Sequence, residues 1–280
     1  MADWGKIASR GHVEDRRGFA PVAGSLSITG VAIVLVVNYL MGGNLGDALT
    51  QLESLPPAQE QTINNGDFEG EDSYEVFAST VVGSTTDFWT TVFNQNNKTY
   101  RPPTLVLFRT GTQSGCGVAT SQVGPHYCPV DRIIYLDETF FDELSSRFGA
   151  QGGDVAEAYV MAHEVGHHVQ NELGTMDQVQ NLQRLNPGRA NEVSVQLELQ
   201  ADCYAGLWAH SIRDLNVFQT DEIKEAMDAA AAVGDDRIQE KVAGYSNPES
   251  WTHGSSEQRV SWFNKGYESG EFSACNSVQL

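Results

Sequence analysis

The sequence predicts an α+β domain that is mainly helical with a small sheet, preceded by one N-terminal transmembrane helix. Three patterns support this prediction: an uncharged apolar run near the N-terminus, two short β-branched runs between residues 104 and 136, and helical periodicity on both sides of those runs. The chain has 280 residues, of which 40% are hydrophobic. This suffices for one sizeable folded domain and excludes a wholly disordered protein.

Acidic residues outnumber basic residues in the chain, with 37 Asp and Glu against 17 Lys and Arg and a formal net charge of −20. A surface that binds the phosphate backbone of nucleic acid needs the opposite sign. We therefore expect no nucleic-acid partner.

The apolar run near the N-terminus has the length of a membrane span. No charged residue occurs in residues 18–46, and residues 26–41 are almost continuously apolar. A helix needs about 20 residues to cross the hydrocarbon core, and residues 21–41 supply them. We predict a transmembrane helix there. A cleaved signal peptide and a buried core helix are the alternatives, although no strong cleavage site follows the run.

Charges beside the run predict its orientation and the domain boundaries. Arg10, Arg16 and Arg17 precede the run, whereas acidic residues follow it, so the positive-inside rule predicts a cytoplasmic segment 1–20. The rest of the protein is then periplasmic or extracellular. Residues 42–71 are polar and rich in Gly, Asn and Pro, which predicts a linker or stalk and leaves residues 72–280 as the folded domain.

The elements of the domain follow from periodicity and turn residues. Apolar side chains in residues 72–94 recur with the period of a helix, with Gly83 as the weak point, and residues 104–108 and 132–136 have the composition of strands. Further helices are expected in five segments, which are residues 140–148, Asp154 to Gly174, 191–213, 220–233 and 256–270.

Two of these helices have candidate N-caps. Asp137 is placed to cap the helix over residues 140–148. Asp154 with Glu157 three residues later is typical of a capping box, and Gly174 stands where the same helix would end.

The four cysteines all follow the predicted span. An even number of cysteines can pair completely in an oxidising compartment, and three pairings exist for four residues. Cys116 and Cys128 bracket a turn-rich segment with the Gly and Pro that a short closed loop needs, which leaves Cys203 with Cys275. Four free thiols are the alternative.

A His-Glu-x-x-His motif lies inside the helix that begins near Asp154. His163 and His167 are four residues apart and project from one helix face, about 40° apart, so both imidazoles can reach one cation. A catalytic zinc site needs three protein ligands and one open position. Glu164 lies a quarter turn round the helix, where its carboxylate can take a proton from a water that attacks a carbonyl.

A second acidic motif supplies a candidate third ligand. Glu198 and Asp202 lie four residues apart on another predicted helix and therefore share one face. Glu198 can complete the metal site, and Asp202 can accept the free ring N–H of a ligand histidine and fix its tautomer. The alternative is an ordinary amphipathic helix with two surface acids.

Other candidate ligands fit the pattern less well. A third histidine of the extended His-Glu-x-x-His-x-x-Gly-x-x-His motif is excluded because residue 173 is Leu. His168 points about 100° away from His167, which favours a structural role, as we also expect for His126 and His210. Cys203 follows Asp202 directly, but an oxidising compartment favours a disulfide over metal binding.

Three segments carry a resemblance to a known family: GCGVATSQVGPHYCPVDRIIYLDETFFDEL at residues 115–144, HEVGHHVQ at 163–170 and LELQADCYAGLWA at 197–209. They resemble the neutral zinc metallopeptidase family of bacterial membrane-anchored proteins, and VEDRRG at residues 13–18 is similar to the N-terminal segment of that family. The resemblance implies a zincin-like fold and one zinc ion of the gluzincin type. It also implies that His163, His167 and Glu198 are the ligands and that Glu164 is the base.

We therefore expect a membrane-anchored zinc metallopeptidase that hydrolyses peptide bonds in a peptide or protein substrate. The strand at 132–136 is the candidate for aligning an extended substrate because it closely precedes the metal helix. His253, Arg259 or Tyr204 can supply a donor to the developing oxyanion, and we favour His253, whose alternative role is to begin the last helix.

A catalytically silent, membrane-tethered zinc-containing interaction module is the alternative function. The intact Glu164 argues against it, because a purely structural site has no use for an acid between its two histidines. The sequence does not specify the substrate, the choice between endo- and exopeptidase, or the oligomeric state.

Overall fold

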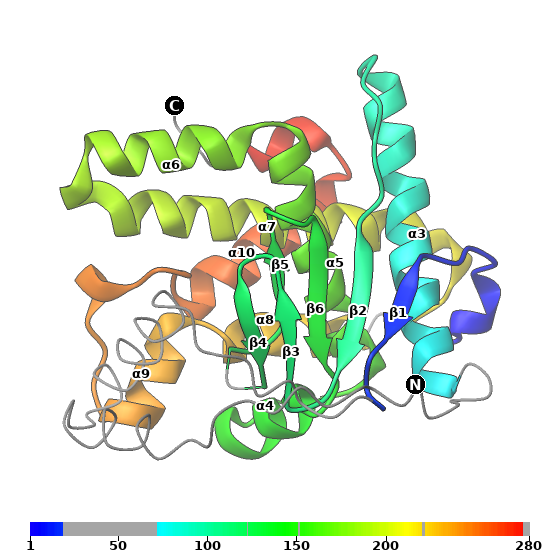
Figure 1. Ribbon diagram of the computed structural model, residues 1–280, viewed down its shortest axis with the longest axis horizontal. Coiled ribbons are helices and arrows are strands. Elements are labelled where there is room, and N and C mark those ends of the chain that lie inside the picture. Colours follow the sequence, from blue (N-terminus) through cyan, green and yellow to red (C-terminus); the bar gives the residue numbers. More distant parts are fainter. Residues whose placement is uncertain (19–71, 122, 151, 220–221, 277–280) are drawn as a thin grey trace, which may run out of the picture.

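The computed structural model describes residues 1–18, 72–121, 123–150, 152–219 and 222–276 (Figure 1). A sheet packs against a layer of long helices, and the α+β fold class is confirmed. The helices are α3 Ser73–Gln95, α4 Phe140–Phe148, α5 Asp154–Glu172, α6 Thr175–Leu185, α7 Ala190–Ile212, α8 Ile223–Ala232, α9 Asp235–Ala243 and α10 Ser256–Ser269. Short 3-10 helices are η1 Trp4–Lys6, η2 Pro187–Arg189, η3 Arg213–Leu215, η4 Pro248–Ser250 and η5 Phe272–Cys275.

The main sheet has four strands in the order β1-β2-β6-β5. Its strands are β1 Val13–Asp15, β2 Thr104–Phe108, β6 Ile133–Asp137 and β5 His126–Cys128. The pairs β1–β2 and β2–β6 are parallel, whereas β5 is antiparallel to β6 and ends the sheet. A separate hairpin consists of β3 Gly111–Ser114 and β4 Gly117–Thr120. The strands expected at 104–108 and 132–136 are therefore present as β2 and β6.

Helices α5, α7 and α10 form the packed centre of the molecule. Helices α5 and α7 approach closely at Gly166, where a Cβ atom would lie 3.0 Å from the carbonyl oxygen of Ala201. No larger residue fits this crossing without a shift of the neighbouring backbone. The close approach matters for function because it brings the acidic face of α7 next to the histidines of α5.

Two predicted helix caps are wrong. Helix α4 begins after Thr139, and Asp137 is instead a buried acceptor for the backbone N–H groups of Thr110 and Thr139. Helix α5 has Gly153 as its N-cap, and Asp154 is the first helical residue. Asp154 accepts from other segments, because its Oδ2 atom takes the indole N–H of Trp4 at 3.0 Å.

Both expected disulfides are confirmed. Cys116 pairs with Cys128, and Cys203 pairs with Cys275. The first bond connects the β3–β4 hairpin to β5 at the edge of the sheet, and the second connects α7 to the C-terminal η5.

The N-terminal segment requires a correction. We expected residues 1–20 to be separate from the folded domain, but the structure packs residues 1–18 onto it, with β1 in the main sheet. A three-residue strand that pairs with a partner about 90 residues away leaves no local pattern in the sequence. The predicted span and linker lie outside the described residues. Among the residues that are described, none of the helices is long and apolar enough to cross a bilayer.

Candidate metal centre

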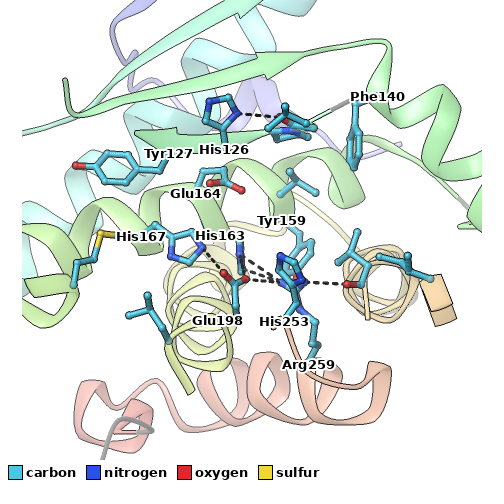
Figure 2. Close-up of a pocket in the computed structure, with 18 residues that line it drawn as sticks. His126, Tyr127, Phe140, Tyr159, His163, Glu164, His167, Glu198, His253 and Arg259 are labelled. Carbon is cyan, nitrogen blue, oxygen red and sulfur yellow. Dashed lines mark hydrogen bonds and ion pairs between the residues drawn. The ribbon is translucent and has the colours of Figure 1, made fainter. Parts of the chain in front are cut away.

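Helix α5 directs the two histidines of the His-Glu-x-x-His motif into one cleft (Figure 2). His163 and His167 are buried, and their ring centres are 4.7 Å apart. They face the cleft because the motif spacing places both on the same side of α5. The two rings are therefore close enough to bind one ion.

Glu198 on α7 lies against both rings. Its Oε2 atom is 3.2 Å from Nε2 of His163, and its Oε1 atom is 3.4 Å from Nε2 of His167 (Figure 2). Ligand atoms at about 2.0–2.1 Å from a tetrahedral zinc ion are separated from one another by about 3.3 Å. The donor types and their spacing therefore fit one zinc ion with three protein ligands and a fourth position open.

Hydrogen bonds to the other ring nitrogens fix the tautomers. Nδ1 of His163 donates to Asp202 at 2.8 Å, and Nδ1 of His167 donates to Oε1 of Gln170 at 2.9 Å. The amide of Gln170 is itself oriented, because its nitrogen donates to the carbonyl of Leu197 at 2.7 Å. In each ring, Nε2 is therefore the atom that is placed to bind a cation.

Asp202 is completely buried and is surrounded by donors. Arg259 donates from Nε to Oδ2 at 2.9 Å and from Nη2 to Oδ1 at 2.8 Å, and the hydroxyl of Tyr159 donates to Oδ1 at 2.6 Å. Burial alone would favour the neutral acid, but Arg259 and His163 outweigh it and lower the pKa of Asp202. Asp202 is thus an anion that orients His163 and is oriented by Arg259.

Charges in the cluster favour bound cations. Burial disfavours a charged imidazole, but Asp202 and Glu198 outweigh it and raise the pKa of His163 to about 9. Glu198 likewise raises the pKa of His167 against the effect of burial. The histidines hold the pKa of Glu198 well below its ordinary value, although burial opposes this. A metal ion would replace the protons that the cluster otherwise attracts.

Glu164 stands apart from the three candidate ligand groups. Its side chain lines the same cleft and is 7% exposed. Figure 2 shows it on the side of the cluster that faces β5, between the histidines and His126. This position suits a base that acts on a molecule bound between the metal and the strand.

The cleft has a volume of about 480 Å³, and its walls beyond the metal cluster are largely apolar. Phe140 lies toward the Tyr159 end of the cleft, and Tyr127 lies toward the His167 end (Figure 2). The apolar lining side chains are Val123, Pro125, Phe140, Val160, Met176, Leu197, Val233 and Ile238.

Residues 2–278 match the model of a family described as "Putative neutral zinc metallopeptidase". The chain belongs to this family. The resemblance found in the sequence is therefore confirmed, and zinc is the metal that the family description implies for this donor set.

Two curated relatives align with most of the chain. The protein YpfJ of Escherichia coli K12, described as uncharacterized, is 42% identical over 246 residues, which are 88% of this chain and 85% of YpfJ. The protein Rv2575 of Mycobacterium tuberculosis, described in the same way, is 46% identical over 188 residues, which are 64% of this chain and 63% of the relative. No solved structure matches the chain.

His253 lines the same cleft as the candidate metal cluster, as the sequence suggested. Its Nδ1 atom is 3.1 Å from Oδ1 of Asp235, whose Oδ2 atom also accepts from the backbone N–H groups of Thr252, His253 and Gly254. Burial opposes a charged ring, but Asp235 and Glu198 raise the pKa of His253. The side chain of His253 is half exposed, so its other nitrogen can meet a ligand in the cleft.

The structure excludes one candidate donor, changes the expectation for His126 and bears out the expectation for His168. Tyr204 does not line the cleft and packs instead against Trp89 and Phe272. His126 lines the cleft, whereas we expected a purely structural role. His168 is structural as expected, because its ring nitrogens lie against the hydroxyl of Tyr127 and the carbonyl of Arg101.

Sequence reasoning missed three polar groups of the site. Gln170 follows His167 by three residues, and Tyr159 precedes His163 by four, so helical spacing on α5 could have found both. Asp235 had no such signal, since it begins α9 and meets His253 only through tertiary folding.

Proposed function

We propose that this protein is a zinc-dependent peptidase that hydrolyses peptide bonds, with Glu164 as the general base. One observation carries the proposal: three zinc-type donors share a cleft with a carboxylate that is not among them and with the edge strand of a sheet. A structural zinc site is usually closed by four protein ligands, whereas a catalytic site keeps one position open.

Bound zinc would polarise the scissile carbonyl and lower the pKa of an attacking water. His163, His167 and Glu198 would hold the ion. Glu164 would accept the proton of the attacking water and deliver it to the leaving amine. Asp202, fixed by Arg259, would keep the His163 ring in the tautomer that binds metal.

Strand β5 is our candidate for aligning the substrate. The sequence suggested the strand at 132–136, but that assignment is wrong because β6 is paired with β2 on one side and β5 on the other. Strand β5 ends the sheet, and residues 123–127 line the cleft. An extended peptide can add to such an edge through backbone hydrogen bonds.

We assign the oxyanion donor to His253. Asp235 holds its Nδ1 atom, which leaves Nε2 for the substrate. Arg259 is a weaker candidate, because Asp202 already engages its Nε and Nη2 groups. A donor of this kind contributes through hydrogen bonding to charge that develops in the transition state.

The apolar walls of the cleft favour peptides with apolar side chains next to the scissile bond. Phe140, Val160, Met176 and Leu197 present apolar surface in the same cleft as the candidate metal cluster. Burying such surface against an apolar substrate side chain is favourable at about 25 cal/mol per Å².

The test compares wild type with Glu164→Gln in the full-length chain, because residues 1–18 belong to the folded domain. We expect a mixed peptide library to be cleaved by wild type and the variant to lose at least about 100-fold in kcat/KM with its zinc retained. Glu257→Gln, at an exposed site on α10, is the matched control and should cleave normally. Zinc in both proteins with cleavage by neither would favour the alternative, a zinc-containing interaction module.

A further inference from the structure

We propose that residues 1–17 are a permanent part of the folded domain, so that they lie on the same side of any membrane as residues 72–276. We call residues 1–17 the N-terminal strap. This inference does not depend on the proposed enzyme activity.

The strap extends the main sheet by backbone hydrogen bonds. In β1, Val13 pairs with Leu105 and Asp15 pairs with Leu107 in parallel register. The backbone N–H of Leu105 donates to the carbonyl of His12 at 3.0 Å, and the backbone N–H of Arg16 donates to the carbonyl of Leu107 at 2.7 Å. Removing the strap would leave these groups of β2 without their partners.

The strap also packs backbone to backbone against α3. The N–H of Gly11 donates to the carbonyl of Ser79 at 2.7 Å, and the hydroxyl of Ser79 donates back to the carbonyl of Gly11 at 2.9 Å. A Cβ atom on Gly83 would lie 2.6 Å from the backbone of Arg10. Glycine weakens a helix, but at position 83 it allows the backbone of the strap to approach α3 closely.

Arg17 ties both ends of the intervening segment to the domain. Its side chain is 2% exposed and forms ion pairs with Asp15 at 2.7 Å, Asp72 at 2.9 Å and Glu138 at 2.6 Å. Asp72 is the N-cap of α3. Arg17 and Asp72, which are distant in sequence, therefore lie side by side in the fold.

The start of the strap contacts both helices that carry the candidate metal ligands. The backbone N–H of Ala2 and the indole N–H of Trp4 donate to Asp154 at the beginning of α5, at 2.8 and 3.0 Å. The Trp4 ring stacks parallel to Trp208 of α7 with a centroid separation of 6.4 Å. These contacts continue the domain core, in which Ile7 of the strap is buried.

These contacts have a topological consequence. A single crossing by residues 21–41 would place the strap and residues 72–276 on opposite sides of the membrane and would break every contact described above. The proposal therefore places the strap and residues 72–276 together on one side of any membrane. The orientation expected from the positive-inside rule is the arrangement that this proposal replaces.

Cross-linking in the full-length chain, in intact cells, tests the proposal. The side chains of Ser9 and Asp87 touch at the surface, one on the strap and one on α3. We would introduce Ser9→Cys with Asp87→Cys and apply a short membrane-permeant bismaleimide. The control pairs Ser9→Cys with Lys241→Cys, which is exposed on α9, at the other end of the molecule from β1 in Figure 1.

We expect the 9–87 cross-link, identified by mass spectrometry of the joined peptides, to exceed the 9–241 control at least about tenfold. All three positions lie at the surface, and circular dichroism of the purified variants should match wild type. The proposal is overturned if the 9–87 link does not exceed the control. The predicted single crossing would then also require that an impermeant maleimide label the Asp87→Cys variant in intact cells but the Ser9→Cys variant only after permeabilisation.

Discussion

Two buried arginines hold this fold together in different ways. Arg259 donates to one fully buried carboxylate, Asp202, beside the candidate metal cluster, whereas Arg17 pairs with three partly exposed carboxylates at the junction of the strap with the domain. Arg259 holds Asp202 in the position in which that carboxylate orients the His163 ring. Arg17 joins segments that are distant in sequence. The comparison predicts that loss of Arg259 impairs metal binding and catalysis, and that loss of Arg17 impairs stability.

The largest effect is expected for Arg259→Met. Breaking a buried ion pair by removing one partner costs about 3–5 kcal/mol, since Asp202 remains buried without its counter-charge. We also expect zinc affinity to fall about 10- to 100-fold, because Asp202, the acceptor of the His163 ring N–H, is no longer held in place by Arg259. Chelator titration measures the affinity, and denaturant unfolding measures the stability. A variant with normal zinc affinity would refute the positioning role of Arg259.

Arg17→Met tests the other region, the junction of the strap with the domain. We expect the free energy of unfolding to fall by about 2–3 kcal/mol, less than for Arg259, because water screens carboxylates that are 14–42% exposed. Zinc affinity of the folded protein should stay within about twofold of wild type. A loss of zinc affinity as large as that of Arg259→Met would abolish the distinction between the two regions.

A smaller, pH-dependent effect is expected at Glu157, which lies on α5 between the two regions. Burial raises its pKa to about 7 from an ordinary value of 4.5. The folded state therefore binds this proton more tightly than the unfolded state, and the stability that this provides is full below pH 4.5 and is lost as pH rises through 7.

Glu157→Gln removes this titration. We expect the variant to gain about 2 kcal/mol over wild type at about pH 8, because water screens part of the roughly 3 kcal/mol that the raised pKa represents, and almost nothing at about pH 4.5. Urea unfolding at the two pH values measures the difference. An equal effect at both pH values would mean that packing, not ionisation, dominates at this site.

The sequence predicted that His163, His167 and Glu198 would cluster better than it predicted the rest of the molecule, and the reason is physical. The spacings of His163 with His167 and of Glu198 with Asp202 are local, and a helix converts each of them into a shared face. The same periodicity located α3, α5, α7, α8 and α10 to within a few residues. The cysteine pairing could be predicted from the sequence because one pair encloses a short, turn-rich loop.

What the sequence did not predict depends on distant contacts. Strand β1 has three residues and forms only by pairing with β2, so no local sequence pattern predicted the packing of the strap. The position of β5 at the sheet edge depends on the order of strands, which periodicity does not report. Asp235 acquires its role only where α9 meets the loop of His253.

Zinc content of the full-length chain is the most direct test of the central assignment, that Glu198 joins His163 and His167 around one ion. After dialysis against a weak chelator, elemental analysis should find about one zinc per wild-type chain and less than about a tenth as much in Glu198→Ala. Glu192→Ala, an exposed acid on the same helix, should keep the wild-type content. Equal zinc in Glu198→Ala and wild type would contradict the account.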